Sequence, residues 1–211
     1  MQQGQVIPIF PTTITISNIG RSFTQDEMSC MMSFKDKVRE NESNTKDIYI
    51  LEHQPLAEIK RLCHLALQDY LVKIYNPINP NDISLKITQS WLNFSKKNQF
   101  HYKHTHHNSI LCGVLYIDAI KDKDTIVFTK ADTGENWQVQ PKDNNPFNMH
   151  DVPFSVATGD MIIFPSNLTH SVPMIGREGR LSLAFNSFFN GDIGFINGPM
   201  KGINYLKINT L

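Results

Sequence analysis

The chain has 211 residues, 40% of them hydrophobic, which is enough to bury a sizeable core. Its 20 lysines and arginines balance 20 aspartates and glutamates, so no overall positive field favours nucleic acid or an anionic membrane as a partner. No apolar run reaches the length of a membrane span, and the first five residues lack the basic start of a secretory signal, so we expect a cytoplasmic protein.

The N-terminal part is predicted to supply an edge strand and two helices. β-Branched residues alternate in part over residues 6–16, and the prolines among them favour an edge strand or its lead-in. Thr24-Gln25-Asp26-Glu27 has the form of a capping box, which predicts a helix that continues to about Val38. Apolar residues then keep helical spacing over residues 55–74, with charged side chains on the opposite side. We expect this second helix to pack against a sheet.

Short strand-like runs follow, separated by polar turns. They cover residues 83–94, 110–117, 125–128, 161–165 and 181–189. The run 110–117 is continuously apolar, as expected for a strand that is covered on both faces, so we expect it to lie in the centre of a sheet. The polar stretch 131–151 is too long for a tight turn, and it fits either a lid or substrate loop or an irregular surface loop.

Many short strands after two helices indicate an α+β fold whose C-terminal part is a double-stranded β-helix, or jelly roll. We expect a single domain over residues 1–211. Its parts would be an N-terminal strand and helices packed on the sheet (1–80), the jelly-roll core (81–190) and a C-terminal segment (191–211). This architecture by itself implies no activity.

Four of the eight histidines lie within residues 101–107. His104 and His106 have the spacing of two side chains on one face of an extended strand, about 6 to 7 Å apart along the backbone, so both can reach one ion. His107 would point away. A His-x-His pair is weak as a motif on its own, because a solvated turn contains such pairs too. The strand-like run 161–165, followed by His170, supplies the context that favours a metal site.

These residues resemble the 2-oxoglutarate and Fe(II) dependent dioxygenases, in particular the prolyl-hydroxylase-like and phage-type oxygenases. That family pairs a His-x-Asp/Glu motif with a distant histidine and places an Arg or Lys shortly beyond it, often as Arg-x-Ser. His104, His170, Arg180 and Ser182 match this order. The resemblance covers roughly residues 85 to 190.

The resemblance implies an iron site. His104, His106 and His170 would bind one face of Fe(II) and leave the other positions to 2-oxoglutarate and dioxygen, as a facial triad does. The chain departs from the family at His106, where Asp or Glu is expected. A third imidazole keeps three ligands but lowers the negative charge on the iron by one.

The resemblance also implies a site for the co-substrate 2-oxoglutarate. Arg180 would bind its far carboxylate through a charge-assisted contact, with the hydroxyl of Ser182 on the same strand face. Tyr116 or Tyr102 would add a phenol. The implied reaction hydroxylates a peptide side chain or a small molecule while 2-oxoglutarate is decarboxylated to succinate. We expect no nucleic-acid or membrane partner, and a monomer or homodimer.

Three alternatives stay open. Asp118 or Asp124 could supply the missing carboxylate, with one histidine of the cluster outside the metal's own shell. A three-histidine jelly roll also resembles the cupins, some of which are metalloenzymes that need no 2-oxoglutarate, although their Glu after His-x-His is missing here. A non-catalytic jelly-roll module that binds a ligand or partner protein is the alternative from a different class. We favour the three-histidine oxygenase.

Overall fold

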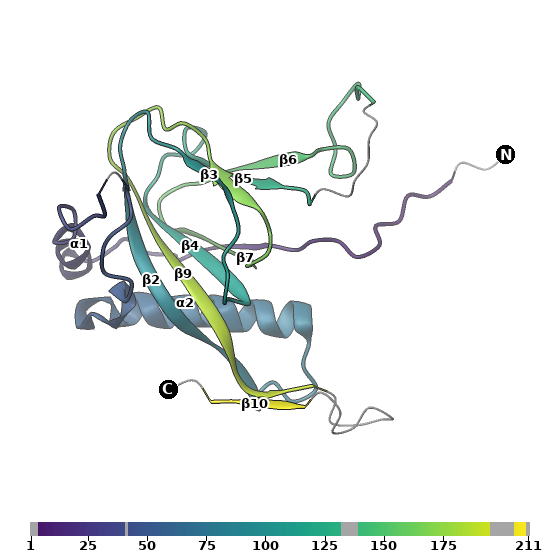
Figure 1. Ribbon diagram of the computed structural model, residues 1–211, viewed down its shortest axis with the longest axis horizontal. Helices are drawn as coiled ribbons and strands as arrows, with labels where there is room; N and C mark the ends of the chain where they lie inside the picture. Colours follow the sequence, from purple (N-terminus) through teal and green to yellow (C-terminus); the bar gives the residue numbers. More distant parts are fainter. Residues whose placement is uncertain (1–3, 41, 132–138, 195–204, 210–211) are drawn as a thin grey trace.

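Two antiparallel sheets dominate the computed structural model, which describes residues 4–40, 42–131, 139–194 and 205–209 (Figure 1). The larger sheet follows the order β1-β7-β4-β9-β10, and β2 pairs with β9 beside this path. Its strands are β1 (Thr15–Asn18), β2 (Ile83–Ser95), β4 (Leu111–Asp118), β7 (Asp160–Pro165), β9 (Arg180–Ile193) and β10 (Leu206–Ile208). The smaller sheet follows the order β3-β8-β5-β6. Its strands are β3 (His101–His104), β5 (Thr125–Thr129), β6 (Asp151–Ser155) and β8 (His170–Val172).

The helices lie between β1 and β2 in the chain. They are α1 (Gln25–Met32) and α2 (Ala57–Tyr70), with short 3-10 turns at Ile50–Glu52 and Gln54–Leu56 and a π-helical turn at Leu71–Tyr75. The capping box is confirmed, because the Thr24 hydroxyl accepts from the Glu27 amide at 3.2 Å and the Glu27 carboxylate accepts from the Thr24 amide at 2.8 Å. Helix α1 ends short of Val38, which forms a β-bridge with Thr45 instead.

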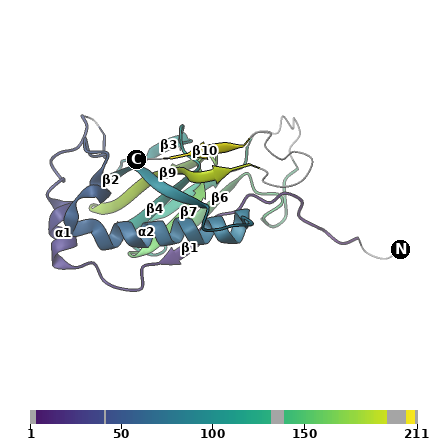
Figure 2. The ribbon, with the colours of Figure 1, turned by 90° about the horizontal axis from the view of Figure 1, so that it is seen from below.

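Helix α2 lies across the outer face of the larger sheet (Figure 2). Its buried side chains recur at helical spacing and pack into the larger of two hydrophobic clusters; they are Ile59, Cys63, Leu67 and Tyr70. None of the helices within the described ranges combines the length and the apolar character that crossing a bilayer requires.

Strand β4 lies between β7 and β9, as its apolar run predicts. Successive residues of a strand point to opposite faces, so β4 serves both hydrophobic clusters. Leu111 and Leu115 join the cluster under α2, whereas Cys112 and Tyr116 join the second cluster, with residues of both sheets. This alternation identifies the face of the larger sheet that can present polar side chains to a site between the sheets.

The structure agrees only in part with the expectations for the N-terminal run, the polar stretch and the C-terminal segment. The N-terminal run forms an edge strand only at Thr15–Asn18, where β1 pairs with β7. The described part of the polar stretch, residues 139–150, contains neither helix nor strand, while Trp137 lies outside the described residues. In the C-terminal segment, β10 pairs with the end of β9, and residues 195–204 likewise lie outside the described residues.

Close packing in the central sheet gives a first prediction. A Cβ atom added at Gly113 of β4 would overlap the ring of Phe185, a fully buried residue of β9. We expect Gly113→Ala to lower the free energy of unfolding by about 1–3 kcal/mol or more, because overpacking forces the ring or the strand to move. Denaturant unfolding measures this. Gly176→Ala is the control, since an added Cβ there meets nothing within 4 Å. Equal stability of the Gly113→Ala and wild-type proteins would contradict the packing described here.

Candidate active site

Three histidines from separate positions in the chain meet at one end of the smaller sheet. His104 ends β3, and His170, its register partner, begins β8. His106 follows in the next turn, where its backbone amide donates to Ser166 O at 2.9 Å. Ring centroids are 4.3 Å apart for His104 and His170, 5.3 Å for His104 and His106, and 5.0 Å for His106 and His170. The three histidines expected from the sequence are therefore brought together, and we call them the histidine cluster.

The ligand atoms of the histidine cluster all lie within 4.8 Å of one another. Two imidazole nitrogens that bind one ion at about 2.1 Å each are at most about 4.2 Å apart, so small ring rotations complete the approach. Among the described residues this is the group of histidine, cysteine or acidic side chains that could hold a metal ion. His107 beside it is exposed.

In each ring of the histidine cluster, Nδ1 forms a hydrogen bond with an oxygen atom of the protein. The acceptors are Tyr102 O at 2.7 Å from His104, Leu168 O at 3.0 Å from His170 and Asn186 Oδ1 at 2.6 Å from His106. A carbonyl oxygen can only accept a hydrogen bond, so the proton resides on Nδ1 and the lone pair on Nε2 stays available. This is the tautomer in which a neutral imidazole binds a metal through Nε2.

Burial favours the neutral form of these rings. It lowers the pKa of His170 to about 3, and the charges of His104 and His106 act in the same direction. Burial also lowers the pKa of His106. At neutral pH both imidazoles are therefore uncharged, so metal binding does not have to displace a proton from them.

A second group of polar side chains lines the same face of the larger sheet. Arg180 and Ser182 of β9 lie opposite Ser95 and Asn93 of β2, and Tyr116 of β4 lies opposite Ser182 on the other side. Directly opposite residues share a face of the sheet. All five side chains are buried, and we call them the polar cluster.

The polar cluster is short of hydrogen-bond partners. Among the described residues, five buried side-chain atoms have none, and four belong to this cluster: Asn93 Oδ1, Ser95 Oγ, Tyr116 Oη and Arg180 Nε. The Arg180 guanidinium also lies over the Tyr116 ring, 5.4 Å from its centroid. Because a buried unpaired polar group costs about 1–3 kcal/mol, a concentration of them in one place indicates a site whose partner is a ligand.

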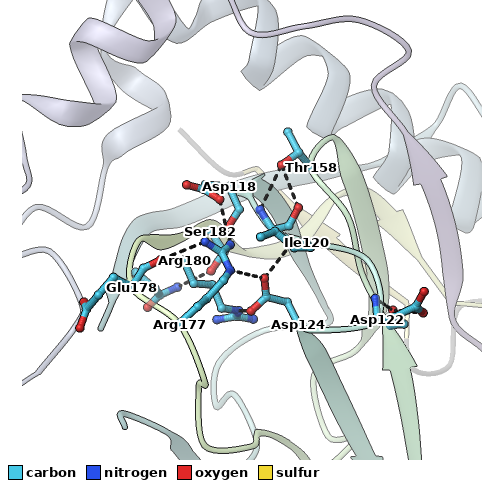
Figure 3. A network of polar contacts seen from close by, with 12 residues as sticks. Asp118, Ile120, Asp122, Asp124, Thr158, Arg177, Glu178, Arg180 and Ser182 are labelled. Atoms are coloured by element: carbon cyan, nitrogen blue, oxygen red, sulfur yellow. Dashed lines mark hydrogen bonds and ion pairs between the residues drawn. The ribbon is translucent and has the colours of Figure 1, made fainter. Parts of the chain in front are cut away.

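Arg180 has only part of a counter-charge within the protein (Figure 3). Its Nε lies 3.7 Å from Asp124 Oδ1, while the other oxygen of Asp124 accepts from Arg177 Nε at 2.9 Å. Arg177 also pairs with Asp118 at 2.8 Å. Asp124 is 3% exposed and Arg180 2% exposed, so this ion pair is buried, and Asp124 shares its carboxylate between Arg180 and Arg177. The longer contact leaves Arg180 able to bind a further carboxylate.

The structure also shows where the residues of two alternatives left open by the sequence lie. Asp118 and Asp124 bind the guanidinium of Arg177, and neither belongs to the histidine cluster. Tyr102 is 79% exposed and meets the Phe100 ring edge to face, with 4.7 Å between ring centroids, so Tyr116 is the tyrosine that lies in the polar cluster.

Four residues of the site were not recognised in the sequence. They are Asn93, Ser95, His101 and Asn186. The strict alternation of Asn93 and Ser95 with apolar residues in β2 is a signal that could have found the first two. His101 donates to or accepts from Ser43 Oγ at 3.0 Å, and burial together with the charge of Arg180 lowers the pKa of His101 to about 4. Its imidazole is therefore neutral and near Arg180. No pattern in the sequence around Asn186 would have identified it as a residue of the site.

Comparison with known proteins gives one family. Residues 89–186 match the family model described as "Putative 2OG-Fe(II) oxygenase". No match is found among curated proteins. Similar folds occur in a crystal structure of an oxidoreductase of the 2OG-Fe(II) oxygenase family from Burkholderia pseudomallei, with 12% identity and a TM-score of 0.51 over 82% of this chain and 83% of that chain. Apo HygX from Streptomyces hygroscopicus has 14% identity and a TM-score of 0.52 over 83% of this chain and 81% of that chain. HygX with nickel, 2-oxoglutarate and hygromycin B bound has 12% identity and a TM-score of 0.52 over 83% and 82%.

The family match falls on the segment that contains the candidate site. It covers the segment from β2 into β9, which carries all three members of the histidine cluster and all five of the polar cluster. The resemblance seen in the sequence is confirmed over residues 89–186, which match the model of the 2OG-Fe(II) oxygenases, and the antiparallel sheets have the jelly-roll fold of solved proteins such as the Burkholderia oxidoreductase.

Proposed function

We propose that the chain binds Fe(II) through His104, His106 and His170, binds 2-oxoglutarate through the polar cluster, and hydroxylates a small molecule or a peptide side chain. The observation that carries the co-substrate site is the row of unpaired buried atoms on β2, β4 and β9 around Arg180. An anion with several oxygens would accept hydrogen bonds from the three donors among these atoms, Ser95 Oγ, Tyr116 Oη and Arg180 Nε, whereas water alone would leave the charge of Arg180 only partly compensated.

The residues of the chain position the reactants. When bound, iron and 2-oxoglutarate supply the chemistry, in which one dioxygen atom enters succinate with loss of carbon dioxide and the other becomes the hydroxyl of the product. Arg180 holds the far carboxylate of 2-oxoglutarate through a charge-assisted contact. Ser182 lies beside it on the same strand face as a further hydroxyl donor. Burial raises the pKa of Tyr116 to about 12, so its phenol keeps the proton and can donate it in a hydrogen bond.

Because the three proposed ligands are imidazoles, which bring no negative charge to the metal, the charge of the co-substrate becomes important. With no carboxylate ligand, the full charge of the ion remains uncompensated, and the buried Arg180 adds to it. 2-Oxoglutarate carries two carboxylates, one for each positive centre, so its binding would lower the positive charge at both. For the primary substrate, the crystal structure of HygX with hygromycin B bound supports a small molecule.

Anaerobic spectroscopy tests this function. Addition of Fe(II) and 2-oxoglutarate together is expected to give a metal-to-ligand absorption band of the chelate, because the co-substrate binds the iron directly. Neither addition alone should produce the band. Metal binding without the band would favour the cupin-type metalloenzyme, and binding of neither metal nor 2-oxoglutarate would favour the non-catalytic module.

A further inference from the structure

We propose that Asn186 is a positioning residue of the metal site, and that its side-chain amide holds His106 in the tautomer and orientation that turn Nε2 toward the ion. The inference rests on the proposed function, because it takes His106 to be a metal ligand. Asn186 lies on β9 and is 6% exposed, and its Oδ1 lies 2.6 Å from His106 Nδ1 across 80 residues of sequence.

The other contacts of His106 restrict its ring without selecting the tautomer. The His106 ring stacks on the His104 ring at an interplanar angle of 18°. The centroid of the Trp91 ring lies 5.6 Å from the centroid of the His106 ring. Contacts with ring faces do not distinguish a proton on Nδ1 from one on Nε2. The short contact with Asn186 Oδ1 does, because an amide oxygen only accepts and therefore requires the proton on Nδ1.

Two further contacts orient the amide of Asn186 itself. Its Nδ2 donates to Gln89 Oε1 at 3.2 Å, and the buried thiol of Cys112 donates to its Oδ1 at 3.3 Å. Both contacts direct the amide oxygen, and not the amino group, toward His106. The reverse orientation would present a donor to Nδ1, move the ring proton to Nε2 and block the nitrogen that must bind the metal.

His106 differs in this respect from the other two members of the histidine cluster. His104 and His170 donate to backbone carbonyl oxygens, which no side-chain substitution removes. The tautomer of His106 depends on a side chain, so one mutation can disturb a single ligand of the three. The acceptor is also a neutral amide, so it orients the ring without adding negative charge to the site.

Cobalt binding to the metal-free protein tests the role of Asn186. Titration calorimetry with Co(II) is expected to show that Asn186→Ala binds about 10–100-fold more weakly than wild type, the usual cost of losing a group that orients a metal ligand. Asn186→Asp keeps an acceptor at the same place, so it should bind at least as tightly as wild type. Asn190→Ala is the matched control: the same substitution on the same strand, at an amide that donates to Ser84 Oγ at 3.4 Å. Its affinity should equal that of wild type.

The tautomer itself can be observed without metal. Nitrogen NMR of the His106 ring is expected to show Nδ1–H in wild type and in Asn186→Asp, and a shift toward Nε2–H in Asn186→Ala. An unchanged tautomer or unchanged cobalt affinity in Asn186→Ala would overturn the inference. If Asn186→Ala does not fold, weaker cobalt binding by Asn186→Asp than by wild type would overturn it instead. Failure of wild type to bind cobalt would count against the proposed iron site, whereas the NMR comparison would still decide the role of Asn186.

Discussion

Replacing His170 by alanine is expected to abolish retention of Fe(II). His170 is 4% exposed and is the most buried member of the histidine cluster, so the ion would be left with two imidazoles, one of them on the exposed residue His104. We expect the affinity to fall at least 100-fold, which corresponds to about 2.8 kcal/mol. Metal analysis after anaerobic loading with Fe(II) and gel filtration measures the retained iron per chain.

His107→Ala is the matched control for this experiment, because His107 is an exposed imidazole in the same segment that takes no part in the cluster. The His170 ring also packs against Phe164, with 4.7 Å between centroids, so circular dichroism should confirm that the variant is folded. Unchanged iron content in both His170→Ala and His104→Ala would show that the site is wrongly placed. Full retention in His106→Ala would remove His106 from the set of ligands.

The sequence predicted those structural features that depend on the residues of one short segment alone. The capping box fixed the start of α1, and the unbroken apolar run 110–117 predicted the central place of β4, because such a run needs cover on both faces. The sequence also predicted that His104 and His106 converge with His170, but the strand geometry expected for the pair holds only in part, because β3 ends at His104 and His106 lies beyond it.

The polar cluster could not be predicted in the same way. Its membership depends on the register between β2 and β9, in which Asn93 lies opposite Ser182 across 89 residues of sequence. Asp124 shows the same limit: in the sequence it was a candidate metal ligand, whereas in the fold Arg177 takes its carboxylate. Local spacing gives the direction of a side chain relative to its own strand, but the partner on another strand depends on long-range pairing.

Removing the charge of Arg180 is expected to separate metal binding from co-substrate binding. In the proposed function, its guanidinium would compensate a carboxylate of 2-oxoglutarate inside the fold, a charged contact worth roughly 1.5 to 3 kcal/mol, or at least about tenfold in affinity. Arg180→Ala should therefore keep iron and bind 2-oxoglutarate at least about tenfold more weakly. Arg177 continues to neutralise Asp124 in this variant, so no buried carboxylate is left without a partner.

Arg180→Lys should recover part of the affinity, because the positive charge survives while the planar fork of donors is lost. Calorimetric titration of 2-oxoglutarate into the anaerobic iron forms compares the wild-type, alanine and lysine proteins. Arg61→Ala on α2 is a control for the loss of an arginine, since Arg61 forms a surface pair with Glu58. Equal affinity in wild type and Arg180→Ala would remove Arg180 from the co-substrate site. No binding to wild type would leave the chain as a three-histidine metalloprotein with another use for the unpaired donors around Arg180, because those buried groups require a partner whether or not it is 2-oxoglutarate.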